Sequence, residues 1–398
     1  MHTKLIISKL DNQGRGISYY NNKIIFIPNS LPNEEVEVEI TKENSKYYEG
    51  KVINIIKPSL NRVLPKCPYI NDCGGCTFMH LNYTDQIEYK RNVVKDILKK
   101  YCGIDESVKI IESNKDLFYR NKVELKIHRN TYSYYNNSSH DYCDIAKCLL
   151  ANNTINEIID YHSFMNIYDG SITIRTNYNN DLLLVIETSK FEFFNDPPEN
   201  VVGVVVNGKT VYGNNYFFDY IGEYKFKVSY DSFFQINNYI ANEIFKILNN
   251  NLSGNTLLDL YCGSGVMGIS LKDKYNKIIG IEKVKNAIKD ANDNAVLNKV
   301  KNYKYYAGDT SEILPTINDE IDTVIIDPPR SGLNDKTLND ILIINPDKIG
   351  YVSCNPITLA RDLNILKERY NITKIYALDM FPNTYHVETV MILEKKDV

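Results

Sequence analysis

The chain has 398 residues, of which 43% are hydrophobic, and its formal net charge is -4 at pH 7. That length exceeds the usual single-domain range, so two or three domains are expected. No apolar run approaches the ~18 residues that a membrane-spanning helix needs, and the N-terminus lacks the apolar region of a signal peptide. We therefore expect a cytoplasmic protein, in which eight cysteines act as ligands or catalysts rather than disulfides.

Residues 1–57 read as a small β domain. The runs Lys23–Ile27 and Glu35–Ile40 are β-branched or alternate between apolar and charged residues, with Asn, Gly and Pro between them. This pattern predicts a short five-stranded barrel of the OB kind. The segment from Gly14 to Leu60 resembles a TRAM domain, an RNA-binding module that is fused to RNA-modifying enzymes.

The next part, residues 58–230, reads as a mixed and mainly antiparallel central domain. An amphipathic helix is predicted over 84–101, with Thr84 as its N-cap and several basic residues in its C-terminal half. Residues 1–150 as a whole are net basic, whereas the rest of the chain is net acidic. A polyanionic partner is therefore expected to bind mainly through the N-terminal part.

Three thiols, Cys67, Cys73 and Cys76, lie close together in a Gly-rich stretch of the central domain. A fourth thiol is required to complete a tetrahedral site, and Cys102, Cys143 and Cys148 are available. Four thiolates suit either zinc or an iron–sulfur cluster, and the spacing alone slightly favours zinc.

Residues 231–398 change to a strand–loop–helix rhythm, which predicts a doubly wound parallel sheet of the α/β class. The last two strands are joined by a short link, which suits an antiparallel pair at one edge. The expected strands are Thr256–Tyr261, Lys277–Glu282, Tyr303–Ala307, Asp322–Asp327, Ile349–Ser353, Lys374–Asp379 and Thr389–Leu393.

A glycine-rich turn, with Gly263 and Gly265, follows the first of these strands directly and predicts a nucleotide cradle. Glu282 ends the next strand, where a carboxylate accepts the hydroxyls of an adenosine ribose. These features alone fit a dinucleotide as well as S-adenosylmethionine. Three acids favour S-adenosylmethionine: Asp259 before Tyr261, Asp309 after the third strand, and Asp327, with two prolines, at the end of the fourth.

Two further residues complete a possible reaction. Cys354 follows the fifth strand, and Glu388 precedes the last one. Carbon 5 of uracil is a weak nucleophile, and addition of a thiolate to carbon 6 turns the ring into an enolate that accepts a methyl group. A carboxylate then removes the proton from carbon 5. We expect a lowered thiol pKa, supported by a helix that begins near Thr358.

These motifs together resemble the RNA uracil-5-methyltransferase family over nearly the whole chain. The resemblance implies a Rossmann-like class I methyltransferase domain and cofactor contacts from Gln235, Tyr261, Glu282 and Asp327. It also implies Cys354 as nucleophile and Glu388 as base. The thiol pattern resembles that of the ribosomal RNA enzymes, which hold a [4Fe–4S] cluster. This resemblance favours the cluster over zinc, with Cys67, Cys73, Cys76 and Cys148 as ligands. It favours Cys148 over Cys143 as the fourth ligand.

The resemblance implies methylation of 23S ribosomal RNA through a covalent enzyme–RNA intermediate. The first alternative is a transfer RNA uracil-5-methyltransferase, which the barrel and the thiols disfavour because the bacterial transfer RNA enzyme lacks both. An amino-group methylase is disfavoured by Arg330 and Cys354. A non-catalytic RNA-binding or ribosome-assembly protein is disfavoured by Cys354 and Glu388. No obligate protein partner is expected. The sequence does not identify the uridine, the number of sites or the oligomeric state.

Overall fold

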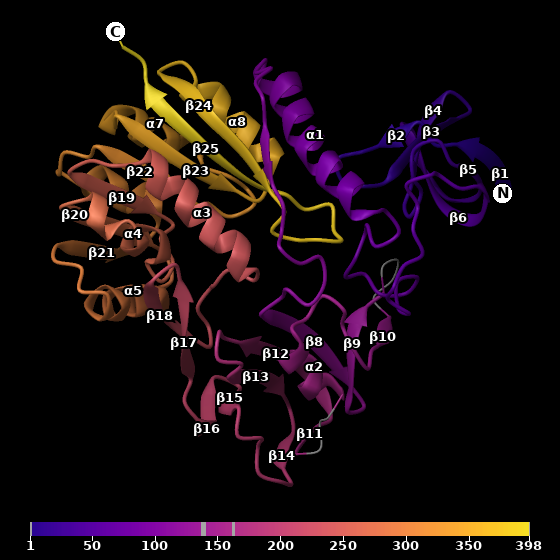
Figure 1. The fold of residues 1–398 in the computed structure, drawn as a ribbon, viewed down its shortest axis with the longest axis horizontal. Coiled ribbons are helices and arrows are strands. Elements are labelled where there is room, and N and C mark those ends of the chain that lie inside the picture. The colour runs from indigo at the N-terminus through magenta and orange to yellow at the C-terminus, as the bar shows by residue number, and fades with distance from the viewer. Residues whose placement is uncertain (1, 137–140, 161–163, 398) are drawn as a thin grey trace. The chain divides into compact units, whose positions relative to one another are not determined.

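A computed structural model of the protein describes residues 2–136, 141–160 and 164–397 (Figure 1). The chain forms two compact units. The first comprises Met1–Val93, Tyr134–Cys143 and Phe381–His386, and the second comprises Val94–Ser133, Asp144–Met380 and Val387–Val398. The connection that precedes Glu388 is thus grouped with the N-terminal residues.

The N-terminal residues form one six-stranded sheet in the order β1-β5-β6-β4-β3-β2. Its core contains Ile7, Ile25, Val36 and Val38, which are fully buried. The sequence predicted five strands, whereas the described residues form six, including the short strands β1 and β2, which pair with β5 and β3. The strands are β1 (His2–Ile6), β2 (Lys9–Leu10), β3 (Gly16–Tyr20), β4 (Lys23–Ile27), β5 (Glu35–Glu43) and β6 (Tyr47–Lys57).

One long helix, α1 (Tyr83–Cys102), follows, and its bounds lie within a residue of the prediction. Its N-cap is Asn82 rather than Thr84, because the Asn82 side chain accepts a hydrogen bond from the Asp85 N–H group at 3.0 Å. No helix in the described ranges combines the length and the apolar character that a membrane crossing requires.

The middle of the chain forms a mixed sheet in the order β10-β9-β8-β12-β13-β15-β16, together with two short two-stranded pairs, β11-β14 and β17-β18. The pairings among β8, β9, β12, β13, β15 and β16 are antiparallel except that of β13 with β15. The elements are β8 (Lys122–His128), β9 (Thr131–Tyr135), β10 (Tyr142–Asp144), α2 (Asn153–Asp160), β11 (Met165–Ile167), β12 (Asp169–Thr176), β13 (Leu182–Thr188), β14 (Phe191–Phe193), β15 (Val201–Val206), β16 (Lys209–Gly213), β17 (Tyr216–Ile221) and β18 (Tyr224–Ser229).

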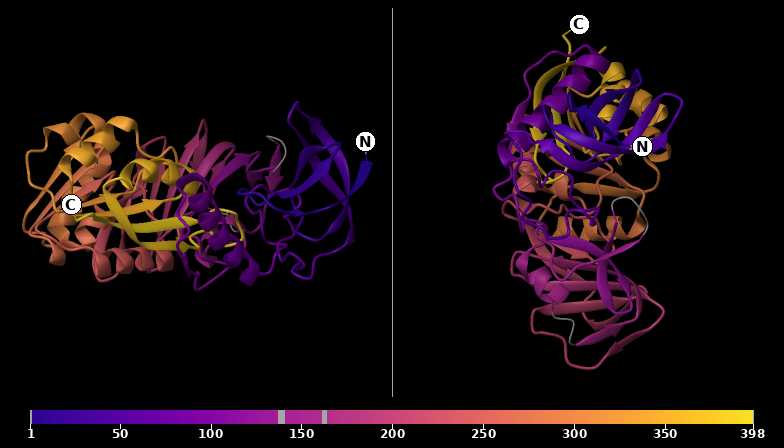
Figure 2. Two further views of the ribbon diagram at one scale, coloured as in Figure 1. Left: turned by 90° about the horizontal axis from the view of Figure 1, so that it is seen from above. Right: turned by 90° about the vertical axis from the view of Figure 1, so that its right-hand side faces the viewer.

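The C-terminal part is the doubly wound sheet that the sequence predicted, with the strand order β21-β20-β19-β22-β23-β25-β24-β7. Helices cover both of its faces (Figure 2). The first five of these strands run parallel. Strands β24 and β25 form the expected antiparallel pair, but β25 lies between β23 and β24 and the edge is occupied by β7. The sequence missed β7 (Lys109–Ile111), a three-residue strand that pairs with β24 from far upstream in the chain.

The predicted strands of this sheet agree with the structure to within a few residues. The elements are α3 (Asn238–Asn251), β19 (Thr256–Leu260), α4 (Val266–Ser270), η1 (Lys272–Lys274), β20 (Lys277–Glu282), α5 (Lys285–Leu297), β21 (Tyr303–Ala307), α6 (Thr310–Ile313), η2 (Leu314–Thr316), β22 (Thr323–Ile326), α7 (Asp335–Ile344), β23 (Lys348–Ser353), α8 (Pro356–Leu366), β24 (Tyr370–Leu378) and β25 (Glu388–Lys395).

Candidate active site

The predicted site residues gather at one edge of the doubly wound sheet. Strands β19, β22 and β23 are parallel neighbours, so their carboxyl ends meet at that edge. Tyr261, Asp327 and Cys354 are the residues that follow these three strands. The antiparallel strand β25 begins at the same edge with Glu388. The topology therefore brings residues together that are more than 120 positions apart in sequence.

The turn after β19 has the strained backbone that a close approach to a ligand requires. Tyr261, Gly263 and Gly265 have φ angles of 62°, 53° and 81°. A Cβ atom on Gly263 would meet no atom within 4 Å, so the backbone there borders open space. Asp259, which is fully buried, supports the turn by accepting a hydrogen bond from the Gly268 N–H group at 2.9 Å. Burial raises the pKa of Asp259 to about 7.

An open pocket with about 440 Å³ of empty volume, solvent included, lies against this turn. Four of the predicted cofactor residues line it, and they come from three separate loops. The remaining lining is mostly apolar, which is typical of a small-molecule site with a few orienting polar groups. The lining residues are Ile221, Phe233, Phe234, Gln235, Tyr261, Cys262, Gly263, Ser264, Val266, Met267 and Asp327.

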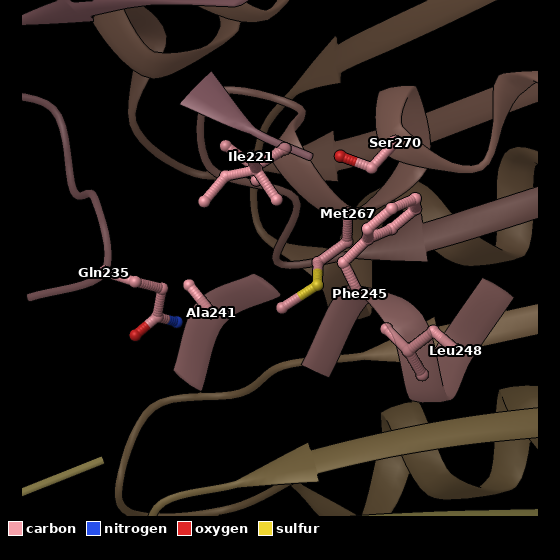
Figure 3. A pocket seen from close by; sticks show the side chains of 8 residues that line it. Ile221, Gln235, Ala241, Phe245, Leu248, Met267 and Ser270 are labelled. Atoms are coloured by element: carbon pink, nitrogen blue, oxygen red, sulfur yellow. The ribbon is translucent and has the colours of Figure 1, made fainter. Parts of the chain in front are cut away.

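A second hollow of about 300 Å³, solvent included, shares part of this lining. Figure 3 shows the Gln235 amide near Ala241 at one end of it, as drawn, with Phe245 and Leu248 toward the other end. Gln235 and Met267 line both spaces. Gln235 is therefore the polar group at the junction of a mixed pocket and an apolar one.

Three other predicted cofactor residues are not part of the pocket lining. Gly265 lies one residue beyond the lining residue Ser264. Glu282 supports the turn, since its carboxylate accepts hydrogen bonds from the N–H groups of Gly263 at 3.2 Å and Val284 at 2.8 Å. Asp309 caps α6 by accepting from the Ser311 N–H and hydroxyl groups. These bonds and Lys283 lower the Asp309 pKa.

Cys354 and Glu388 are neighbours at one end of the antiparallel pair of β23 and β25. Ser353 pairs with Thr389 in antiparallel register, and the next two residues outward are Cys354 and Glu388. Glu388 is only 4% exposed, and burial, followed by the charge of Asp327, raises its pKa well above its usual value. Burial also raises the pKa of Asp327, to about 7. Two carboxyl groups and one thiol thus share a site that disfavours negative charge.

The expected lowered pKa of the Cys354 thiol is wrong. Burial, with a further contribution from the charge of Glu388, raises this pKa to about 11, although α8 begins two residues later at Pro356. The Arg330 guanidinium opposes the rise through its charge and a hydrogen bond. A helix N-terminus stabilises a thiolate only slightly compared with the cost of burying its charge, so burial decides the pKa.

The loop that carries Arg330 is fastened to α8 by residues that the sequence did not single out. Asn355 and Thr358 donate to the Arg330 carbonyl at 2.9 and 3.2 Å. The buried Asp362 accepts from the Leu333 N–H group at 2.9 Å, and Arg361 donates to the Leu333 carbonyl at 2.7 Å. The one indication of these contacts in the sequence is the pair of adjacent opposite charges, Arg361 and Asp362, on one helix. The contacts fix the backbone on both sides of Gly332.

The loop that carries Gln235 is held in a similar way by Asn121, by Arg175 of β12 and by Asp290 of α5. Asn121 donates to the Gln235 carbonyl at 2.9 Å. The buried Arg175 donates to the carbonyls of Ser229, at 2.9 Å, and of Ser232. Asp290 accepts from the hydroxyl groups of both serines. The sequence predicted the role of Gln235 but gave no sign of these supports, which lie far away in the chain.

The structure does not support the predicted metal centre. In the described part of the chain, no group of three or more His, Cys, Asp or Glu side chains is arranged to hold a metal ion. Cys67, Cys73 and Cys76 belong to the first compact unit, and Cys148 belongs to the second. The Cys73 sulfur accepts a hydrogen bond from the Gly75 N–H group at 3.4 Å. The described residues therefore contain no preformed site for zinc or for a four-iron cluster.

Two family models match separate parts of the chain. Residues 218–396 match the model described as tRNA (Uracil-5-)-methyltransferase, and this range contains every residue from Gln235 to Glu388 that is discussed above. Residues 4–53 match the TRAM domain.

Curated relatives and one solved structure match nearly the whole chain. An uncharacterized RNA methyltransferase of Clostridium tetani is 35% identical, over 98% of this chain and 95% of the relative. One from Aquifex aeolicus is also 35% identical, over 99% of each. The crystal structure of Pyrococcus abyssi tRNA (uracil-54, C5)-methyltransferase in complex with S-adenosyl-L-homocysteine is 26% identical, with a TM-score of 0.80, over 98% of this chain and 100% of that chain.

Proposed function

The chain belongs to the RNA uracil-5-methyltransferase family, and we propose that it methylates carbon 5 of a uridine in 23S ribosomal RNA through a covalent bond to Cys354. The predicted fold class, a Rossmann-like class I methyltransferase domain with an N-terminal TRAM barrel and a mixed central domain, is confirmed. The observation that carries the proposal is the convergence of Cys354, Glu388 and Asp327 at the sheet edge that borders the Gln235 pocket.

We propose S-adenosylmethionine as the methyl donor. The open space at Gly263 fits a group that approaches the backbone closely, and the apolar lining of the pocket fits the uncharged parts of a nucleoside. Gln235, Tyr261, Gly263 and Asp327, which line the pocket, would hold it. Gly265, Glu282 and Asp309 in the neighbouring loops are the other proposed cofactor-binding residues, with Glu282 as the acceptor of the ribose hydroxyls. When bound, it supplies an electrophilic methyl group. The structure of the Pyrococcus abyssi protein, which contains S-adenosyl-L-homocysteine, supports this assignment.

In the proposed reaction the Cys354 sulfur adds to carbon 6 of the uracil ring, and carbon 5 becomes nucleophilic and accepts the methyl group. Glu388 then removes the proton from carbon 5, the double bond between carbons 5 and 6 forms again, and the thiolate leaves. Because the thiol pKa is about 11 in the free protein, Cys354 is protonated at neutral pH. Its proton must therefore pass to solvent before the sulfur adds to carbon 6, and the charge of Arg330 favours this loss.

The alternative substrate, transfer RNA, gains support from one comparison. The domain layout was expected to favour ribosomal RNA, but the similarity to the Pyrococcus abyssi tRNA enzyme extends over 98% of this chain. The layout therefore does not discriminate between the two RNAs. The preference for 23S ribosomal RNA rests on the thiol motif alone.

The [4Fe–4S] cluster also rests only on that thiol motif, as a proposal, with zinc as its alternative. Anaerobic purification followed by iron and sulfide analysis tests it, and a cluster gives about four of each per chain. The boundaries at residues 57/58 and 230/231, a cytoplasmic location and the lack of an obligate protein partner stay predictions from the sequence.

The proposed function is tested by incubating the full chain with labelled S-adenosylmethionine and with unmodified 23S ribosomal RNA or transfer RNA. Mapping of the modified positions then identifies the substrate. We expect 5-methyluridine in the ribosomal RNA. Methylation of transfer RNA alone would replace the substrate assignment, and labelling of neither RNA would overturn the proposal.

A further inference from the structure

The connection between β24 and β25, residues 379–387, ends directly at Glu388 (Figure 1). The connection leaves and re-enters the sheet at neighbouring points: Leu378 pairs with Glu388, and the Asp379 N–H group donates to the Ile111 carbonyl at 2.9 Å. Its middle, residues 381–386, belongs to the first compact unit, with the N-terminal half of α1 and the cysteine loop, residues 67–76. Contacts within that unit therefore decide where this segment lies.

Gln86 of α1 is the main polar anchor of the segment. Its side chain is 2% exposed, and its Oε1 atom accepts a hydrogen bond from the Asn383 N–H group at 2.9 Å. Its Nε2 group donates to the Asn383 side chain at 3.2 Å and to the carbonyls of Phe78 and Leu81 at 3.1 and 2.8 Å. A buried amide with both of its ends bonded fixes its partners in one geometry.

The residues just after the cysteine loop hold the same segment from the other side. The N–H groups of Thr77 and Phe78 both donate to the Asn383 carbonyl at 3.0 Å. The Thr77 hydroxyl accepts from the Tyr385 N–H group at 2.9 Å. Thr77 directly follows Cys76, so the cysteine loop ends in the contacts that fix Asn383 and Tyr385.

Two further contacts bind the segment to α1 and to the barrel. Lys90, which is fully buried, donates to the Phe381 carbonyl at 2.9 Å. Tyr385 packs against a buried cluster of Leu31, Phe78 and Leu81. Lys90 is therefore part of the attachment of this segment.

We propose that Gln86 and Thr77 are positioning residues for Glu388, and that they act on removal of the carbon 5 proton rather than on attack by the thiol. Asn383 and Tyr385 lie five and three residues before Glu388, so a shift of the segment moves the start of β25. A displacement of about 1 Å at a reacting group costs up to about a hundredfold in rate. The catalytic part of this inference rests on the proposed function.

The test uses substitutions that remove hydrogen bonds with little change in volume. Thr77→Val removes only the hydroxyl acceptor, Thr77→Ser restores it, and Gln86→Met removes the amide. Thr373→Val is the matched control, because its hydroxyl group bonds to the Ile392 carbonyl on the same hairpin, away from residues 381–386. Rapid-quench reactions with RNA and S-adenosylmethionine measure the formation and decay of the RNA adduct at Cys354 separately.

We expect Thr77→Val and Gln86→Met to slow adduct decay and kcat by about ten- to a hundredfold, with adduct formation and KM for RNA within about threefold. Thr77→Ser and Thr373→Val should behave like the parent protein. Unchanged adduct decay in both test variants, or a change in KM for RNA alone, would overturn the inference.

Amide hydrogen exchange separates this inference from the proposed function, since it requires no activity. Exchange in residues 381–388 should become faster in Thr77→Val and Gln86→Met but not in Thr373→Val, whereas residues 256–265 should be unchanged. Equal exchange in the parent protein, Thr77→Val, Gln86→Met and Thr373→Val would overturn the positioning role. Faster exchange in a protein that methylates no RNA would overturn the proposed function and leave the attachment of the segment intact.

Discussion

The carboxyl edge of the doubly wound sheet and the cysteine loop were both identified from short motifs, but the two predictions agree with the structure to different degrees. At the sheet edge, Tyr261, Asp327, Cys354 and Glu388 come together as predicted. In the cysteine loop, residues 67–76, the thiols do not form a metal site with any other described residues. The two regions differ in what fixes their side chains.

At the sheet edge the positions follow from the hydrogen-bond ladder. Once Ser353 pairs with Thr389, the backbone of Cys354 lies beside that of Glu388. The cysteine loop consists of turns, such as the bond from the Cys73 N–H group to the Tyr69 carbonyl at 2.8 Å. Turns leave the direction of each thiol open. A motif at a strand end therefore predicts geometry, whereas a motif in a turn predicts only composition.

The largest expected effect is the loss of activity in Cys354→Ala. If the sheet edge is the reaction centre, methylation should fall by at least about a thousandfold, because carbon 5 becomes nucleophilic only after the Cys354 thiolate has added to carbon 6. The control is Cys102→Ser. The Cys102 thiol is buried, donates to the Ala360 carbonyl at 3.0 Å and lies outside the pocket lining. Methylation rates of both variants check this. Equal rates in Cys354→Ala and Cys102→Ser would remove the thiol mechanism.

Arg330→Met should have the next largest effect. Arg330 lowers the Cys354 pKa against burial, so its loss raises that pKa and leaves less thiolate at neutral pH. We expect adduct formation at pH 7 to slow about tenfold, the effect of a shift of about one unit. Because the parent pKa is about 11, the rate of adduct formation should rise with pH between 7 and 9 in both proteins. A faster or unchanged Arg330→Met enzyme at pH 7 would contradict this role.

Asp327→Asn should change stability in a direction set by pH. Burial raises the Asp327 pKa from 3.8 to about 7, so the folded state binds more protons than the unfolded state between these values. Its contribution to the free energy of unfolding therefore falls as pH rises through that window. The Tm of Asp327→Asn relative to the parent should be higher by a few degrees at pH 8 than at pH 5. A relative Tm that is higher at pH 5 than at pH 8 would show that the fold stabilises the charged Asp327 carboxylate.

Cys73→Ser should have the smallest effect on the reaction. Serine retains an acceptor for the Gly75 N–H group and the same backbone pairing with Asn136. We expect adduct formation at Cys354 to stay within about threefold of the parent. The same protein preparation is assayed for iron. A large loss of activity together with a loss of iron would show that the thiols hold a group that the protein requires, and the contrast between the two regions would disappear.

Much of the methyltransferase half was predictable because its strands are apolar runs with clear ends. Strand β20 agrees with the prediction residue for residue, and β23 differs by only one residue. The supports of the site were not predictable. Gln86, Arg175 and Asp362 look like ordinary polar helix or strand residues, and their partners lie up to 297 positions away. The thiol pKa was also beyond the sequence, since it depends on burial and on a neighbouring acid that only the fold supplies.

One measurement tests the covalent role of Cys354 most directly. Glu388→Gln removes the proposed base, so the full chain carrying this substitution, incubated with S-adenosylmethionine and 23S ribosomal RNA, should stop after methyl transfer. Mass spectrometry of the digested complex should then find a methylated uridine attached to the peptide that contains Cys354. A protein that methylates RNA but forms no adduct, or forms one at another residue, would contradict the account.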